Sequence, residues 1–201
     1  MNERIVIGIC GASGVIYGIR LLRALLSGPR EIHLIISRAG ALVLSYELGF
    51  KNGLAFEELL KQNDVLLHKD ARLIIHEPDN LMAAPASGSF RHSGMVIVPC
   101  SMKTLGAIAS GLATTLIARA ADVCLKEKRP LVLVPRETPL NKIHIKNMLL
   151  AHEAGATILP PAPAFYFRPV SIYDLVDFVV GRVLDQLHIK HDLVGEWNGS
   201  D

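Results

Sequence analysis

The chain has 201 residues, roughly the length of one domain. Half of the residues are hydrophobic, so the chain can bury a core and is neither disordered nor collagen-like. Lys and Arg number 21 against 19 Asp and Glu, a formal charge of +2, and aromatic residues make up 5%. This charge is too small to predict binding to nucleic acid or anionic membranes, and the few aromatic residues argue against platforms for stacking bases.

The predicted elements alternate between strands and helices. Short apolar runs rich in β-branched residues predict strands at residues 5–10, 32–36, 65–67, 73–75, 95–98, 131–134 and 157–159. Helical spacing predicts helices at residues 15–26, 39–48, 54–61, 102–128 with a break near Gly111, 140–154 and 170–187. Residues 78–89 are expected to be a loop, and Pro99, which has no N–H to donate, is expected to end its strand. The pattern predicts a single-domain α/β fold: a three-layer, Rossmann-like (flavodoxin-like) parallel sheet with helices on both faces.

The cysteine pattern and the two apolar stretches indicate the compartment. Cys10, Cys100 and Cys124 are odd in number, far apart and without a Cys-x-x-Cys, which argues against disulfides or a zinc cage and for a reducing compartment. The stretches at residues 5–19 and 105–121 are interrupted by glycines or polar residues, so neither predicts a signal peptide or a membrane span. We expect a cytoplasmic protein.

Polar and small residues follow the first strand of the predicted sheet. Gly11-Ala-Ser-Gly14 would let a ligand approach the backbone, and the free N–H groups of the next helix attract anions. The spacing is not Gly-x-Gly-x-x-Gly, and the second strand ends in Ser37 rather than in an acidic residue. A tight turn needed only for packing stays an alternative.

Two further strand ends carry similar chemistry. Residues 99–104 (Pro-Cys-Ser-Met-Lys-Thr) place Ser101 as a helix cap, and residues 135–139 (Pro-Arg-Glu-Thr-Pro) present Arg136 beside Glu137. Each has a structural alternative, a capped helix or a salt-bridged loop. Groups that can bind an anion thus follow three of the predicted strands, and this favours a ligand site at that edge of the sheet.

The remaining polar features fall late in the chain. Tyr166, in a proline-rich loop, and Arg182, in the last helix, could together hold a phosphate. No His-Glu-x-x-His or facial triad occurs, and Asp174 and Asp177 form one Asp-x-x-Asp on a helix face that is expected to be solvated. A metal enzyme is therefore disfavoured.

At this point the chain resembles the flavin prenyltransferases, the flavoproteins of the UbiX and phenylacrylic acid decarboxylase-associated type. Six motifs in order, spanning residues 5 to about 190, carry the resemblance: Gly11-Ala-Ser-Gly14 with Tyr17-Gly18, Pro85-Ala-Ser-Gly-Ser89, Pro99-Cys-Ser-Met-Lys-Thr104, Arg119-Ala-Ala-Asp122 with Leu125-Lys-Glu127, Pro135-Arg-Glu-Thr-Pro139 and Pro163-Ala-Phe-Tyr166. Leu81 stands where some members have a Trp in the prenyl pocket.

The resemblance implies a reaction and an assembly. Reduced FMN would be alkylated at N5 and C6 by dimethylallyl phosphate, and the prenylated FMN would serve a separate UbiD-type decarboxylase. It further implies an FMN-binding domain over residues 1–190, a homododecamer, and a tail over residues 191–201, with Trp197, that contacts a neighbouring subunit.

The resemblance also assigns residues. Those implied for FMN are Gly11, Ala12, Ser13, Ser37, Ser101, Met102, Lys103, Thr104 and Arg136. Those implied for the prenyl phosphate are Ser87, Arg119, Lys126, Glu137, Tyr166 and Arg182, with Ser89 in the same loop as Ser87. Catalytic roles fall to Ser13, Glu47, Lys126 and Glu137.

Three other functions stay open. A flavin-dependent decarboxylase acting on a cysteinyl substrate would have a related fold, but residues 85–89 lack the Asn that such enzymes typically show. A non-catalytic FMN carrier would not need the Lys126, Glu137, Tyr166 and Arg182 set. A direct aromatic-acid decarboxylase would need a base that the chain does not obviously offer.

Overall fold

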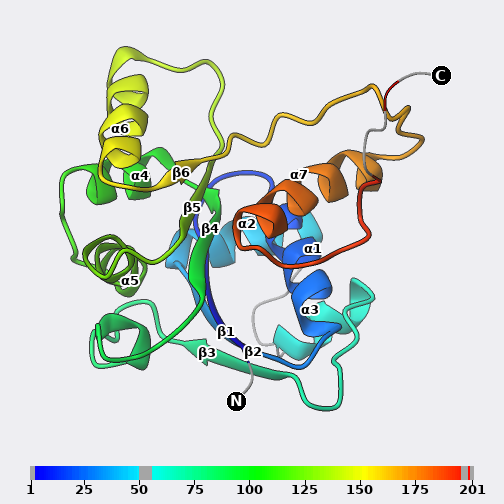
Figure 1. Ribbon diagram of the computed structural model, residues 1–201, viewed down its shortest axis with the longest axis horizontal. Coiled ribbons are helices and arrows are strands. Elements are labelled where there is room, and N and C mark those ends of the chain that lie inside the picture. The colour runs from blue at the N-terminus through cyan, green and yellow to red at the C-terminus, as the bar shows by residue number, and fades with distance from the viewer. Residues whose placement is uncertain (1–2, 50–55, 196–198, 200–201) are drawn as a thin grey trace.

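The computed structural model describes residues 3–49, 56–195 and 199, and one parallel sheet organises them (Figure 1). Its six strands are β1 (Glu3–Ile9), β2 (Arg30–Ile36), β3 (Arg72–His76), β4 (Gly94–Cys100), β5 (Leu131–Pro135) and β6 (Thr157–Ile158). They lie in the order β3-β2-β1-β4-β5-β6, and every neighbouring pair is parallel. The expected single α/β domain with a Rossmann-like sheet is confirmed.

Helices cover both faces of this sheet. They are α1 (Val15–Leu26), α2 (Arg38–Leu48), α3 (Phe56–Gln62), α4 (Met102–Ala109), α5 (Leu116–Lys126), α6 (Lys142–Glu153) and α7 (Ile172–Gln186), with one 3-10 turn, η1 (Ala84–Ala86). Helices α1, α2, α3 and α7 share an apolar core with Ile5, Ile7 and Ile9; we term this side the α7 face. Helices α4, α5 and α6 share a second core with Val6 and Cys10, on the α5 face. Figure 1 shows the sheet between α4, α5 and α6 on the left and α1, α3 and α7 on the right.

Burial on both faces explains the strand sequences. Residues 5–9 of β1 are fully buried, with alternate side chains entering the two cores. No strand position there meets water, so the apolar run has no polar alternation.

The strand order reverses between β1 and β4. The chain runs outward from β1 to β3 at one edge and then returns to place β4 on the other side of β1. In sheets of this type the crevice outside the carboxyl ends of the two strands at the reversal is the usual ligand site. The Cys10 amide donates to the Pro99 carbonyl at 3.1 Å, so the segments that leave β1 and β4 lie side by side there.

Two predicted strand features are wrong. Residues 65–67 form no strand: the Val65 amide donates to the Leu60 carbonyl at 2.9 Å, and Val65 is buried in the core of the α7 face, which accounts for its apolar character. Pro99 does not end β4, which continues to Cys100. The pairing with β5 shifts register between Ile97 and Cys100, so no ladder donor is required at Pro99.

The helix boundaries follow their caps. The region predicted as one interrupted helix is α4 and α5, separated by residues 110–115, which confirms the break near Gly111. Helices α6 and α7 begin two residues later than expected because Asn141 and Ser171 cap them. Within the described ranges, no helix combines the length and apolarity needed to cross a bilayer.

Candidate active site

A cavity of about 520 Å³ opens at the carboxyl ends of β1, β2 and β4, and we term it the flavin cavity after the ligand that the resemblance implies. It is lined by Gly11, Ser37, Arg38, Ala39, Pro78, Asp79, Ser101, Lys103, Thr104, Thr115 and Ile117. Five of these are residues that the resemblance implies for FMN: Gly11, Ser37, Ser101, Lys103 and Thr104. The volume lies within the range of small-molecule sites, about 300–1,000 Å³.

The floor of the flavin cavity depends on close backbone packing between the β1 loop and α2. A Cβ added at Gly11 would lie 2.4 Å from the Ala39 Cβ, and one added at Gly40 would lie 2.6 Å from the Ile9 carbonyl oxygen. Ser37 caps α2 by accepting from the Gly40 amide at 2.9 Å. The two glycines therefore bring the cap hydroxyl of α2 beside the β1 loop.

The start of α4 supplies hydroxyls and a cation. Ser101 Oγ accepts from the Thr104 amide at 3.3 Å and donates to Thr104 Oγ1, which in turn donates to Cys10 Sγ at 3.2 Å. Lys103 is exposed and pairs with no described residue, so its ammonium is available to an anion in the cavity. Burial raises the pKa of the Cys10 and Cys100 thiols, which agrees with small buried hydrophobes rather than nucleophiles.

Ser13, Glu47 and Arg136 lie at the loop that follows β1. The Glu47 carboxylate accepts from the amides of Gly14 at 2.9 Å and Val15 at 3.2 Å, so it occupies the N-terminus of α1. Arg136 donates from Nε to the Ser13 carbonyl at 3.0 Å. The amides at the start of α1, which the sequence predicts to attract an anion, are therefore already bonded to the Glu47 carboxylate.

A second group gathers on the α5 face beside η1, where Ser87, Ser89, Arg119 and Lys126 come together. The hydroxyls of Ser87 and Ser89 are hydrogen-bonded to each other at 2.8 Å, and Arg119 Nε donates to the Ala86 carbonyl at 3.1 Å. Lys126 pairs with Glu127, and a Cβ at Gly88 would lie 2.6 Å from the Lys126 Nζ. This set is termed the α5 cluster.

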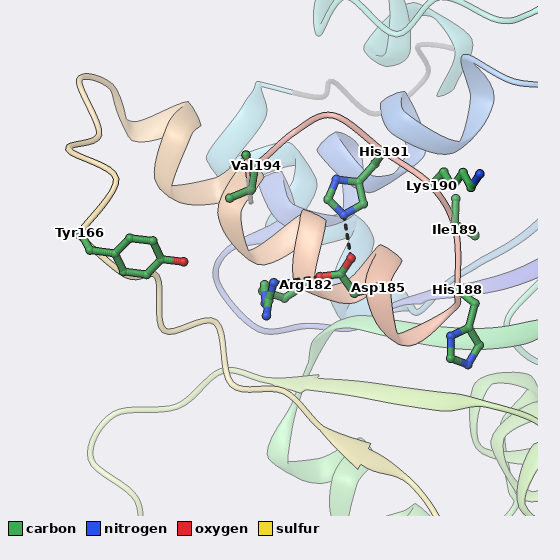
Figure 2. A pocket seen from close by; sticks show the side chains of 9 residues that line it. Tyr166, Arg182, Asp185, His188, Ile189, Lys190, His191 and Val194 are labelled. Carbon is green, nitrogen blue, oxygen red and sulfur yellow. Dashed lines mark hydrogen bonds and ion pairs between the residues drawn. The ribbon is translucent and has the colours of Figure 1, made fainter. Parts of the chain in front are cut away.

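The third group is on the α7 face. Tyr166 and Arg182 line a cavity of about 670 Å³ together with Asp185, His188, Ile189, Lys190, His191, Val194 and Gly195. Figure 2 shows the Tyr166 hydroxyl pointing toward Arg182. We term this the α7 cavity.

Within one chain the sheet separates Lys126, in the α5 cluster, from Tyr166 and Arg182. Glu137 belongs to neither group: it lies exposed on the loop after β5, where it accepts from the Thr138 amide at 3.0 Å. Leu81 is half exposed on the loop that leads to η1. Trp197 lies outside the described residues. Within one chain, the residues that the resemblance implies therefore fall into three groups, with Glu137 outside them, and do not form one site.

Comparisons with known proteins decide the family. The model of the Flavoprotein family matches residues 1–184. Flavin prenyltransferase UbiX of Halalkalibacterium halodurans is 46% identical over 191 residues, covering 95% of this chain and 91% of that protein. The chain belongs to the flavin prenyltransferases of the UbiX type.

Two solved structures that are similar to this chain agree with the fold. The crystal structure of AnUbiX (PadA1) in complex with FMN and dimethylallyl pyrophosphate has a TM-score of 0.89, 43% identity and full coverage of both chains. A dodecameric FMN-dependent UbiX-like decarboxylase from Escherichia coli O157:H7 has a TM-score of 0.86 and 40% identity, covering 98% of this chain and all of that one.

For a flavin prenyltransferase of this architecture, the sequence reasoning missed several polar residues. Asp79 and Thr115 line the flavin cavity, Arg129 holds the Gly88 and Phe90 carbonyls, and Asp185 and His191 line the α7 cavity. Asp185 carried a signal, because it stands three positions after Arg182 on one helix face. The other four are brought in by loops, for which the sequence offers no periodic signal.

Proposed function

We propose that this protein transfers the dimethylallyl group of dimethylallyl phosphate to N5 and C6 of reduced FMN. The observation that carries the proposal is the flavin cavity at the β1–β4 reversal, where five residues that the resemblance implies for FMN converge from the ends of three strands. The complex of AnUbiX with FMN and dimethylallyl pyrophosphate, at 43% identity, supports FMN together with a phosphorylated dimethylallyl donor.

The residues of the flavin cavity fit FMN. Lys103 and the hydroxyls of Ser101 and Thr104 at the start of α4 suit a phosphate, and Gly11 and Ser37 suit the close approach of a flat ring. Ala12 and Met102 flank these positions and are buried or half-buried. Arg136 fixes the Ser13 loop at the rim of this cavity.

The chemistry requires the ester C–O bond to break, with phosphate leaving and a carbon bond forming to N5, which loses its proton. On ring closure C6 gives up a proton and the alkene of the transferred group gains one. Lys126, Arg119, Tyr166 and Arg182 would hold the leaving phosphate, and Glu137 would protonate it. Ser13 and Glu47 would move protons during closure, and Ser87 and Ser89 would cover the isoprenoid.

An assembly would complete the site. Lys126 and Arg182 lie on opposite faces of one chain, so a single pocket needs them from different copies. The dodecameric relative from E. coli supports a homododecamer. Residues 1–190 would form the FMN-binding domain and residues 191–201 a tail toward a neighbouring subunit. A UbiD-type decarboxylase as recipient and a cytoplasmic location stay predictions.

A direct decarboxylase is the second candidate, because the E. coli relative is described as an FMN-dependent decarboxylase. The likeness to the cysteine decarboxylase TvaF, at 14% identity, concerns the fold alone. An FMN carrier would leave the α5 cluster and the α7 cavity without a use.

The test is an anaerobic incubation of the purified protein with reduced FMN and either dimethylallyl phosphate or dimethylallyl pyrophosphate, followed by mass spectrometry of the flavin. We expect a flavin heavier by one dimethylallyl unit with the monophosphate. Glu137→Gln should bind FMN normally and form the first bond more slowly. Unchanged flavin from protein that binds FMN would overturn the proposal, and release of CO₂ from a cinnamic acid without prenylation would favour the decarboxylase.

A further inference from the structure

The segment that follows α7 turns back and packs on that helix. Ile189 is buried, and a Cβ at Gly181 of α7 would lie 3.0 Å from the His191 Cε1 and 3.1 Å from the Val194 Cγ2. A side chain at position 181 would therefore crowd this segment. Residues 188–195 form one wall of the α7 cavity, and we term them the C-terminal wall.

A chain of hydrogen bonds leads from this wall to Arg182. The Leu193 amide donates to His191 Nδ1 at 3.3 Å, so the neutral imidazole carries its proton on Nε2. Nε2 is 3.0 Å from Asp185 Oδ1 and donates to it, while Asp185 Oδ2 accepts from Arg182 Nη1 at 3.0 Å. Figure 2 shows His191, Asp185 and Arg182 in this order, with Tyr166 opposite Arg182.

This arrangement orients Arg182 without using up its donors. Only Nη1 is bonded among the described residues, so Nε and Nη2 are left for a ligand in the cavity. A free arginine side chain loses considerable rotamer entropy when it binds an anion, and a side chain already held in one orientation loses less. An isolated pair at this spacing on a helix is weak, but the His191 side chain, only 12% exposed, fixes the carboxylate from the other side.

We propose that Asp185 and His191 are positioning residues for the prenyl donor, which hold Arg182 facing Tyr166 through the C-terminal wall. The proposal rests on the proposed function, in which Arg182 binds the phosphate of the donor. Asp185 and the donor phosphate are both negative and repel each other. If Asp185 acts mainly by positioning Arg182, it lowers the KM for the donor; if it acts mainly by repulsion, it raises that KM.

Substitutions at Asp185 and His191 test this sign. We expect Asp185→Asn and His191→Leu each to raise the KM for dimethylallyl phosphate, by roughly three- to tenfold, with kcat and FMN affinity little changed. His191→Gln keeps an N–H near the Nε2 position, so its KM for dimethylallyl phosphate should stay close to that of the unsubstituted protein. Asp192→Asn removes the same charge from the wall next to His191, outside the chain of hydrogen bonds, and should leave KM unchanged.

Gly181→Ala separates docking of the wall from folding. Alanine has a higher helix propensity than glycine, so the variant should keep helix α7 while its Cβ crowds the wall. We expect faster hydrogen exchange of the Leu193 amide and a raised donor KM. Faster exchange with an unchanged KM would overturn the proposal, as would a lower KM in Asp185→Asn. Absence of prenylation by the unsubstituted protein would instead overturn the proposed function, whatever the exchange shows.

Discussion

Arg136, at the end of β5, donates from Nε to the main-chain carbonyl of Ser13, after β1, at 3.0 Å. The two residues are 123 positions apart, and β4 lies between their strands. This contact fixes the loop that borders the flavin cavity. The planar guanidinium of arginine holds the Nε–H donor in a fixed direction, which the flexible ammonium of lysine does not.

Arg136→Lys keeps the charge and loses that N–H. We expect the Kd for FMN to rise roughly tenfold, the value of one hydrogen bond to a charged group. Titration of FMN fluorescence measures it. Arg91→Lys, at an exposed position away from the cavity, is the control, and equal Kd values in both variants would contradict the role given to Arg136.

Gly88 lies against the Lys126–Glu127 pair. A Cβ there would be 2.5 Å from the Glu127 Oε1 and 2.6 Å from the Lys126 Nζ, both ends of flexible side chains. Gly88→Ala should therefore fold, displace the ammonium and raise the KM for the donor several-fold while FMN binding persists. Gly106→Ala, whose Cβ would meet the Asn147 amide nitrogen at 3.2 Å between α4 and α6, should not change that KM.

His92 makes stability depend on pH. Burial lowers its pKa to about 4, so between pH 6.5 and 4 the unfolded chain binds more protons than the folded one. The free energy of unfolding should fall as pH falls through this window, and His92 should contribute on the order of 1 kcal/mol after allowance for partial exposure.

The check is urea unfolding of the protein and of His92→Asn at pH 7 and pH 4.5. Asn keeps a donor near the Nδ1 that bonds the Gly94 carbonyl at 3.1 Å, but it does not titrate. The variant should lose less stability between the two pH values. The variant should still lose some stability on going from pH 7 to pH 4.5, because burial also lowers the pKa of His76.

Mixed assemblies test whether copies share a site. Lys126→Ala and Arg182→Ala should each be nearly inactive. If donor pockets take Lys126 and Arg182 from different copies, joint refolding of the two variants should restore activity in roughly one site in four by random assembly. Lys126→Ala mixed with Arg119→Ala is the control: both residues lie on α5 of one copy, so no site regains the pair and activity should stay low.

The sequence predicted the flavin side of the site better than the donor side. Gly11, Ser37 and Ser101 follow strands, and the parallel order of the sheet brings strand ends together, so position in the chain is enough to place them. Arg182 and Lys126 lie on helices of opposite faces. Their proximity depends on contacts between copies, for which strand order carries no information.

Tertiary pairing also overrode local patterns. Asp177 was expected on a solvated face, but it pairs with Arg20 of α1, and both side chains are largely buried. Asp174 caps its own helix through Ser171. An Asp-x-x-Asp spacing alone does not distinguish a cap from an ion pair between helices, since both use the same residue type.

Helix α5 has Thr115 and Ile117 at one end, on the wall of the flavin cavity, and Lys126 at the other, about 16 Å away by helical rise. If Lys126 serves the pocket of an adjoining copy, each α5 spans the distance between two reaction centres. A bend or shortening of this one helix would then weaken FMN binding in its own subunit and hinder release of the phosphate group in the adjoining subunit.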